Sequence, residues 1–205
     1  MPPTPLLEDA DVRLEPLTLA HVPDLLAAAR GDRSSYGFTW VPGGLGEMHD
    51  YVNRALAAQA AGDALPYAVR LPGDGAVVGC TRLWDLLRFD VDAPYPQAAE
   101  IGYTWYAPRV QRTVVNTAAK ALLLGHAFDD WGALRVCLKT DARNERSRAA
   151  IARLGAAFEG VRRRVPSTPH GTVRDVAYFS IVREEWPQVR DRLAALRERR
   201  GAGER

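Results

Sequence analysis

Alternating hydrophobic and polar positions mark several short segments of the chain as half-buried β-strands. In the first of them, residues 11–17, the hydrophobic Val12 and Leu14 alternate with charged residues. A Pro-Gly-Asp-Gly sequence at 72–75 separates two further segments of this kind and supplies the residues of a hairpin turn. The predicted strands are 11–17, 65–71, 76–84, 98–106, 134–140, 158–165 and 173–182, with the last two joined through 166–171.

Helical periodicity and helix-end residues predict five helices. In the segment 117–131, Leu123, Ala127 and Trp131 recur at a spacing of four and therefore share one face. Asn144 is a good N-cap, and the helix that follows it is expected to end at Gly155. The predicted helices are 18–30, 47–61 with Gly62 as terminator, 117–131, 145–154 and 185–200.

Two long loops connect these elements. Residues 31–46 contain Tyr36, Phe38 and Trp40 and show no period, so we expect a mobile loop. Its aromatic side chains are consistent both with lining a substrate opening and with covering the core from outside. Residues 85–97 are rich in Asp and Pro and predict a surface loop. The order strand, two helices, three strands, helix, strand, helix, two strands, helix predicts an α/β (α+β) domain around one central sheet.

Length and composition favour one folded domain. The chain has 205 residues, of which 47% are hydrophobic and 25% charged, as is typical of a globular protein rather than a disordered or membrane chain. The first ten residues show neither a basic region nor an apolar core, and Lys120, Gly125 and His126 interrupt the longest apolar runs. We therefore expect a cytoplasmic protein without a signal peptide or a membrane segment.

Charge and cysteine usage argue against nucleic-acid and metal-binding classes. The net charge of +2 is small for a protein that neutralises a nucleic-acid backbone. Arginines cluster at 162–164 and in the last helix, where interleaved acidic residues favour a solvated helix face, with RNA or ribosome contact as the open alternative. Cys80 and Cys137 lie in apolar strands without a Cys-x-x-Cys partner, and the histidines lack ligand spacing. We therefore expect buried, reduced thiols and no metal.

The turn 107–117 has the features of an anion site. It follows a predicted strand and opens a predicted helix, so backbone N–H groups there have no intrahelical acceptor. The positive end of the helix dipole points outward at the same place. Every helix start shares this property, so the turn alone indicates only that an anion such as a diphosphate could bind.

Longer stretches of sequence resemble a known family. EIGYTWYAP, QRTVVNT, RVCLKTDARNERSRAAIARLGA and FEGVRRR are similar to the GCN5-related N-acetyltransferase (GNAT) superfamily, and most similar to its RimJ/RimL-like branch of ribosomal-protein N-terminal acetyltransferases. The resemblance implies a GNAT-like acyl-CoA N-acyltransferase fold, with a mostly antiparallel mixed sheet flanked by helices. It implies a single domain over 1–205, with its core at 11–186 and a C-terminal helix at 185–200. Acetyl-CoA is then the cosubstrate, without a metal.

The resemblance assigns the coenzyme A diphosphate to the turn before the third predicted helix. In that family the turn reads Gln/Arg-x-x-Gly-x-Gly/Ala, which falls here on Gln111, Arg112, Thr113, Val114, Val115 and Asn116, followed by Thr117. Val114 and Asn116 thus replace both small residues. A left-handed backbone at Val114 would cost about 1–2 kcal/mol. The sequence therefore predicts a different local path, weaker cofactor affinity, or loss of acetyl-CoA binding.

The same resemblance places the pantetheine arm against the predicted strand 98–106. This strand would separate from the one beginning at Leu134 and leave its own backbone free. The backbone of Tyr103, Thr104 and Trp105 would then pair with the pantetheine amides and polarise the thioester carbonyl. Packing of Tyr103 and Trp105 in a central strand is expected in either case.

Several side chains are candidates for the chemistry. Asn144 and Ser147 match the family's Asn-x-x-Ser, which implies that Asn144 contacts the pantetheine arm and that the Ser147 hydroxyl donates to the departing thiolate. Without the family, they are a helix N-cap and a polar third position. Glu100 is the candidate general base, provided that partial burial raises its pKa, and an exposed strand-end carboxylate is the alternative. Asp175 and Tyr178 are weaker candidates for shaping an acceptor pocket.

These residues predict an acetyl-CoA-dependent N-acetyltransferase that transfers acetyl directly to a primary amine in a ternary complex, with no cysteine acyl-enzyme. An α-amine with a pKa of about 8 is partly neutral at pH 7, whereas a lysine amine at about 10.4 is almost fully charged. The expected acceptor is a protein N-terminus or a small amine, and a homodimer is allowed. A noncatalytic acyl-CoA sensor or interaction module on the same scaffold stays open because of Val114.

Overall fold

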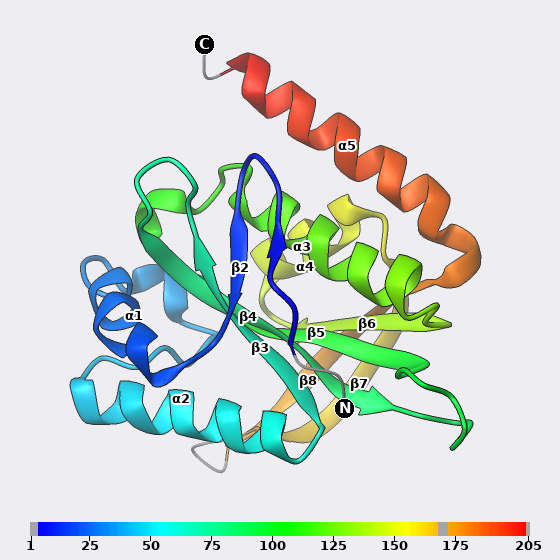
Figure 1. Ribbon diagram of the computed structural model, residues 1–205, viewed down its shortest axis with the longest axis horizontal. Helices are drawn as coiled ribbons and strands as arrows, with labels where there is room; N and C mark the ends of the chain where they lie inside the picture. Colours follow the sequence, from blue (N-terminus) through cyan, green and yellow to red (C-terminus); the bar gives the residue numbers. More distant parts are fainter. Residues whose placement is uncertain (1–3, 168–171, 204–205) are drawn as a thin grey trace.

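The computed structural model describes residues 4–167 and 172–203, and its described strands form one eight-stranded sheet (Figure 1). The strand order is β1-β2-β3-β4-β5-β6-β8-β7. Every neighbouring pair is antiparallel except β5 and β6, which run parallel. The strands are β1 (Leu7–Glu8), β2 (Arg13–Pro16), β3 (Ala64–Arg70), β4 (Val77–Leu87), β5 (Ala98–Tyr106), β6 (Arg135–Asp141), β7 (Ala157–Ser167) and β8 (Thr172–Val182).

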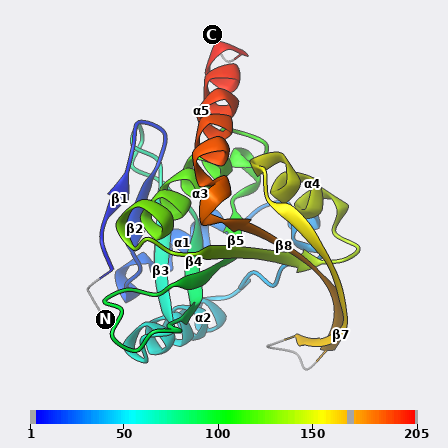
Figure 2. The ribbon, with the colours of Figure 1, turned by 90° about the vertical axis from the view of Figure 1, so that its right-hand side faces the viewer.

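Helices cover both faces of this sheet (Figure 1, Figure 2). α1 and α2 pack on one face and α3, α4 and α5 on the other. Figure 2 shows β7 and β8 curving toward the side that carries α2. The helices are α1 (Val22–Ala28), α2 (Leu45–Ala60), α3 (Val115–Gly125), α4 (Glu145–Leu154) and α5 (Trp186–Gly203), and a π-helical turn, His126–Asp130, continues α3.

The predicted order of elements and the mixed sheet are confirmed, with one addition. The sequence analysis did not predict β1, a two-residue strand that pairs with β2. The Asp9 carboxylate holds the connecting hairpin by accepting hydrogen bonds from the amides of Asp11 and Val12. Two residues are too few to show an alternating pattern, so this strand had no detectable signal in the sequence.

Several predicted boundaries were wrong by a few residues. α2 begins at Leu45 rather than at Glu47. β4 continues to Leu87 and takes up residues predicted as loop, and the last turn of the helix predicted over 117–131 is π-helical. Both predicted helix terminators are confirmed, because Gly62 and Gly155 have φ angles of 83° and 109°. The predicted hairpin turn at 166–171 lies mostly outside the described residues.

β5 and β6 separate halfway along their length, as the family resemblance implied. β5 pairs with β6 only over Ala98–Ile101, although both strands continue further. A β-bulge at Tyr103 and Thr104, which together lie opposite Thr81 of β4, interrupts β5 beyond that point. Tyr103 accordingly has a φ of 52°. Among the strands that the structure describes, none pairs with the separated half of β5 on the side of β6.

A lysine is buried behind this bulge. Lys120 of α3 is 6% exposed, and its Nζ donates to Thr104 Oγ1 at 2.7 Å and to Thr81 Oγ1 at 3.4 Å. Within the described part of the chain no carboxylate pairs with it. Burial lowers the pKa of Lys120 to about 7. Two hydroxyl groups without a negative charge do not compensate a buried ammonium, so its neutral form is favoured.

Gly79 of β4 allows β4 and the far end of β5 to approach closely. Its φ is 156°, and a Cβ there would lie 2.1 Å from the carbonyl oxygen of Trp105 and 2.9 Å from the Cα of Tyr106. Real Cβ atoms do not approach backbone this closely, so any side chain at Gly79 would push the two strands apart beyond the bulge.

We expect Gly79→Ala to lower the free energy of unfolding by about 2–3 kcal/mol, because the methyl group meets backbone that cannot move without breaking the sheet. Urea unfolding measures the change. Gly73→Ala is the matched control, since nothing lies within 4 Å of a Cβ at that position. Equal stabilities of the two variants would contradict the close approach.

Lys120→Met should remove a pH dependence of stability. The lysine pKa is about 7 in the folded chain and about 10.4 in an unfolded one, so the unfolded state binds more protons between these values. The free energy of unfolding of the parent chain should then rise with pH by up to about 1.4 kcal/mol per unit in this range. Urea unfolding at several pH values measures the slope, and an unchanged slope in the variant would show that Lys120 is not its source.

Candidate functional site

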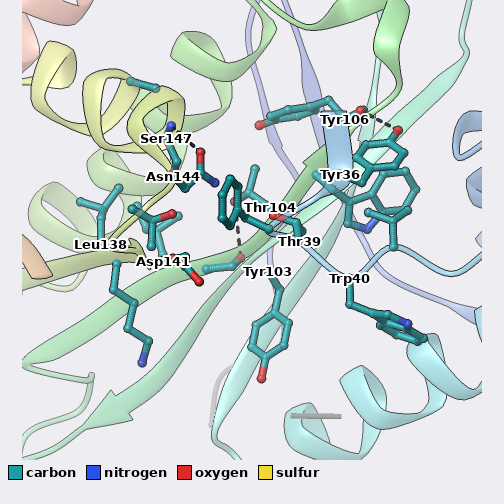
Figure 3. Close-up of a pocket in the computed structure, with 18 of the residues that line it drawn as sticks. Tyr36, Thr39, Trp40, Tyr103, Thr104, Tyr106, Leu138, Asp141, Asn144 and Ser147 are labelled. Carbon is teal, nitrogen blue, oxygen red and sulfur yellow. Dashed lines mark hydrogen bonds between the residues drawn. The ribbon is translucent and has the colours of Figure 1, made fainter. Parts of the chain in front are cut away.

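A cleft of about 1550 Å³ opens where β5 and β6 separate. The two strands, the starts of α3 and α4, α2 and the loop between α1 and α2 line it. Figure 3 shows Asn144 and Ser147 on one side of the cleft and Tyr36 and Tyr106 on the other, with Thr104 between them. The separation of the strands therefore brings together segments that are far apart in the sequence.

Most of the predicted site residues meet in this cleft. Val114, Val115 and Thr117 are the exceptions, because their side chains do not line it. Thr117 instead is buried and accepts a hydrogen bond from Arg153 of α4 at its hydroxyl, 3.3 Å away. The predicted residues that line the cleft are Glu100, Tyr103, Thr104, Trp105, Gln111, Arg112, Thr113, Asn116, Asn144 and Ser147.

The turn before α3 does not have the strain that the sequence predicted as one outcome. Val114 is right-handed, with φ −66° and ψ −25°, so a β-branched residue fits there without backbone cost. The left-handed residue is Arg112, with a φ of 66°. The first of the three predicted outcomes, a different local path, is therefore the one that the structure shows.

Free backbone donors surround this turn. The Thr113 hydroxyl holds the turn, because it donates to the Val110 carbonyl at 2.7 Å and accepts from the Val115 amide at 3.3 Å. Among the described residues, the amides of four neighbouring positions donate to no acceptor. These are the amides of Arg112, Val114, Asn116 and Thr117. With the start of an eleven-residue helix beside them, they form the anion site expected from the sequence.

A second helix start lies across the cleft. Asn144 Oδ1 accepts from the Ser147 amide at 3.0 Å and caps α4, as predicted. The Ser147 hydroxyl is half-buried, lines the cleft and has no partner in the part of the chain that the structure describes. The cap therefore holds the helix start, while the hydroxyl remains available to a ligand.

The separated half of β5 presents both backbone and side chains to the cleft, including the exposed ring of Tyr103. The Tyr103 carbonyl accepts from the Tyr51 hydroxyl at 3.3 Å, and the Thr104 side chain is bonded to Lys120. Trp105 is buried in the core under α1 and α2. Of these three predicted residues, Trp105 can therefore contact a ligand in the cleft only through its main chain.

Glu100 is buried at the base of the cleft. It is 4% exposed, so the alternative of an exposed strand-end carboxylate is wrong. Its Oε2 lies 2.7 Å from Nζ of Lys139 on β6. Burial raises the pKa of Glu100, and the Lys139 cation opposes this rise. The indole nitrogen of Trp84 also lowers the pKa, although it makes no hydrogen bond of standard geometry.

The loop between α1 and α2 ties the two sides of the cleft together. The Ser35 hydroxyl accepts from Gln111 Nε2 at 2.9 Å, and the Ser35 carbonyl accepts from Arg146 at 2.5 Å. Tyr36 is buried and donates to a β5 carbonyl at 3.0 Å, whereas Phe38 is 41% exposed. Both interpretations of the aromatic residues therefore hold, since Tyr36 belongs to the core under α1 and α2, while Tyr36, Phe38 and Trp40 all line the cleft.

Several charged residues of the site were not among those predicted from the sequence. Arg82 and Lys120 stand alone in the apolar segments AVVGCTRLW and TAAKALLL, and Lys139 follows a buried strand residue. A lone charge in such a run was the available signal, because burying it needs a specific partner. Asp175 and Tyr178, named as weaker candidates, do not line the cleft.

Neither cysteine is among the residues that line the cleft. Cys80 and Cys137 are free, and the prediction of burial was wrong for Cys137, which is half-buried. Burial raises the pKa of Cys80 to about 11 and also raises that of Cys137. Among the described residues, no three His, Cys, Asp or Glu side chains are grouped so as to hold a metal ion. None of the described helices combines the length and the hydropathy of a membrane span.

Comparison with known proteins identifies relatives over most of this chain. Residues 11–157 match the family model described as "Acetyltransferase (GNAT) domain". The chain is 32% identical over 113 residues to the Bacillus subtilis (strain 168) protein named "Putative ribosomal N-acetyltransferase YdaF". That match covers 55% of this chain and 57% of the relative, so it spans little more than half of the relative's length.

Solved structures agree with the family match. A GCN5-related N-acetyltransferase from Brucella melitensis superimposes with a TM-score of 0.81 at 29% identity, covering 95% of this chain and 86% of that one. RimJ of Mycobacterium smegmatis, solved in complex with CoA-disulfide, has a TM-score of 0.73 at 26% identity, covering 94% and 92%. These findings confirm the resemblance stated from the sequence, including that to the RimJ/RimL-like branch. The chain belongs to the GNAT acetyltransferase family.

Proposed function

We propose that this protein transfers an acetyl group from acetyl-CoA directly to a primary amine. The observation that carries the proposal is the cleft itself, in which two helix starts with free donors face a strand edge without a partner. A buried carboxylate, Glu100, lies at its base. Family membership supports the same reaction.

The chain's own donors fit a diphosphate on an extended thiol arm. The free amides at Arg112 and Asn116, which line the cleft, and those at Val114 and Thr117 beside it would hold the diphosphate, because neutral donors can crowd around its oxygens at the positive end of α3. The unpaired edge of β5 would align the arm, as a strand partner does. Asn144, across the cleft, would contact the arm through its amide nitrogen. Acetyl-CoA supplies the activated acetyl group when bound.

Glu100 is proposed as the base for the acceptor amine. The nitrogen must be uncharged to attack the thioester carbonyl, and it loses a proton as the carbon–nitrogen bond forms. Glu100 would take that proton directly or through one water. Burial raises the pKa of Glu100, whereas the Lys139 cation opposes this rise and favours the ionised carboxylate that a base requires. The Ser147 hydroxyl would donate a hydrogen bond to the thiolate as the carbon–sulfur bond breaks.

The acceptor is proposed to be a protein N-terminus or a small amine. An α-amine, with a pKa of about 8, needs only a modest base. The name of the Bacillus subtilis relative, a putative ribosomal N-acetyltransferase, supports a protein acceptor. A cytoplasmic location and a homodimer also remain predictions.

Calorimetry separates the enzyme from the alternative of a noncatalytic sensor. The right-handed Val114 removes the backbone strain that motivated the sensor hypothesis. We expect acetyl-CoA to bind and an amine panel to release free thiol. Binding without thiol release would favour the sensor, and absence of heat with both acetyl-CoA and CoA would remove both functions.

Asn144→Ala and Asn144→Asp should both weaken CoA binding, by about tenfold, because each removes the amide donor. They should differ in stability. The aspartate retains the oxygen that caps α4, whereas alanine loses the cap and about 1 kcal/mol of stability. Calorimetry with CoA and urea unfolding measure the two effects. Unchanged CoA affinity in Asn144→Asp would show that Asn144 only caps the helix.

Glu100→Gln should slow turnover about 100-fold or more while sparing CoA binding, because general base catalysis contributes roughly that factor.

The parent rate should fall as the pH falls through the raised pKa of Glu100, since protonation removes the base. Lys139→Met should move this fall in rate to higher pH, because the substitution removes the cation that opposes the rise in the Glu100 pKa. Steady-state rates across pH measure both, and a Glu100→Gln variant with parent turnover would exclude the base role.

A further inference from the structure

Two cations and three aromatic rings contact one another in a row along one wall of the cleft. Lys139 Nζ lies 4.5 Å from the centre of the Trp84 ring. Trp84 meets Tyr103 edge-on, with 5.1 Å between ring centres. The guanidinium carbon of Arg82 lies 4.2 Å from the Tyr103 ring centre and 4.8 Å from that of Tyr51. We call these five residues, all of which line the cleft, the cation–aromatic row.

The two cations of the row are compensated differently. Lys139 is paired with the Glu100 carboxylate. Arg82 is only 5% exposed, and within residues 4–167 and 172–203 no carboxylate forms an ion pair with it. Its Nε is buried without a hydrogen-bond partner there. Aromatic faces stabilise a guanidinium by less than the cost of burying an unpaired ion. Arg82 therefore has donors that an anion in the cleft would satisfy.

Arg82 lies beside the proposed base. Trp84 pairs with Glu100 across β4 and β5, and Arg82 pairs with Gly102. Residues two apart on a strand share a face, so Arg82, Trp84 and Glu100 point to the same side of the sheet. The register separates Arg82 from Glu100 by two residues along the strands, or about 7 Å. One short molecule can therefore place an amine at Glu100 and an anionic group at Arg82.

The other charges of the cleft leave Arg82 uncompensated. The Asp141 carboxylate is paired with Arg143 at 2.9 Å, and the Glu47 carboxylate accepts from a backbone amide at 2.8 Å. Asp63 lines the cleft but is exposed to solvent. Arg54 of α2 lies over an aromatic ring of the α1–α2 loop, 5.5 Å from its centre, and adds positive charge on the same side.

We propose that Arg82 binds a carboxylate of the acceptor, so that the acceptor is a primary amine with a carboxylate a few bonds from the nitrogen. This inference rests on the proposed function. The rings of Tyr51 and Tyr103 both contact the guanidinium but accept no hydrogen bond from its Nε, so its donors suit a planar, two-point pair with a carboxylate. The carboxylate belongs either to a small amino compound or to an acidic first residue of a protein N-terminus, and the chemistry at Arg82 is the same.

Matched acceptors that differ only in charge test this proposal. The small-molecule pair is aspartate α-amide against asparaginamide, and the peptide pair is Asp-Ala-Ala-Ala-amide against Asn-Ala-Ala-Ala-amide. Thiol release gives kcat/KM for each, and calorimetry of the CoA-saturated protein gives its affinity. We expect the acidic member to be favoured about 30-fold or more in at least one pair, since losing one partner of a buried charge pair has at least that effect. The pair that discriminates identifies the source of the carboxylate.

Variants distinguish anion binding from packing. Arg82→Gln should abolish the preference by weakening the acidic acceptor alone, whereas Arg82→Lys should retain part of it because the charge remains. A residue that only packs Tyr51 and Tyr103 would, when changed, affect acidic and neutral acceptors alike. Arg88→Gln, at an exposed arginine outside the cleft, is the control and should keep the full preference.

Two results would overturn the proposal. One is an acidic acceptor that binds and reacts within about threefold of its neutral counterpart in both pairs, including the case in which neither binds. The other is an Arg82→Gln variant that keeps the parent preference. Failure of the proposed function is recognised separately, because acetyl-CoA would then not bind or no amine in a broad panel would release thiol.

Discussion

The early end of the pairing between β5 and β6 is the constraint on which the site depends. A parallel pair continued to the ends of both strands would use up the backbone groups of β5 beyond Ile101. The bulge at Tyr103 and Thr104, in the ladder between β4 and β5, lies just beyond the point where β5 and β6 part, and a bulge bends its strand there. Because α3 follows β5 and α4 follows β6, the same separation places the starts of the two helices on opposite sides of one cleft. The close approach at Gly79 then holds the far end of β5 against β4.

Local signals in the sequence were enough to predict most helices and strands and the ends of the helices near the site. Asn144, Gly62 and Gly155 act within one turn of their own position, so their roles could be predicted without the fold. The path of the turn before α3 could not be predicted in this way. Its left-handed residue is Arg112 rather than Val114, which the family pattern indicated. The burial of Glu100 also depends on distant neighbours and appeared only with the sheet assembled. The family resemblance, not periodicity, supplied the roles proposed for these residues.

Positive charge is unevenly compensated around the centre of the sheet. Lys139 has a carboxylate, Lys120 has two hydroxyls, and Arg82 has two aromatic rings. These three environments compensate a buried positive charge to different degrees, because only the carboxylate beside Lys139 supplies an opposite charge. Since Lys139 is paired with Glu100 and burial favours the neutral form of Lys120, Arg82 is the one of these three that supplies uncompensated positive charge beside the cleft. Such a charge suits a protein whose proposed cosubstrate carries phosphates and leaves as a thiolate.

The raised pKa values of the two cysteines have a practical consequence for following the reaction. A chromogenic disulfide reagent reacts with thiolates, and a thiol with a pKa of about 11, such as Cys80, is almost fully protonated in neutral buffer. Cys80 is also shielded by the core, and Cys137 is half-covered and shifted in the same direction. Colour that develops during turnover would therefore come from liberated coenzyme A, with little background from the folded polypeptide.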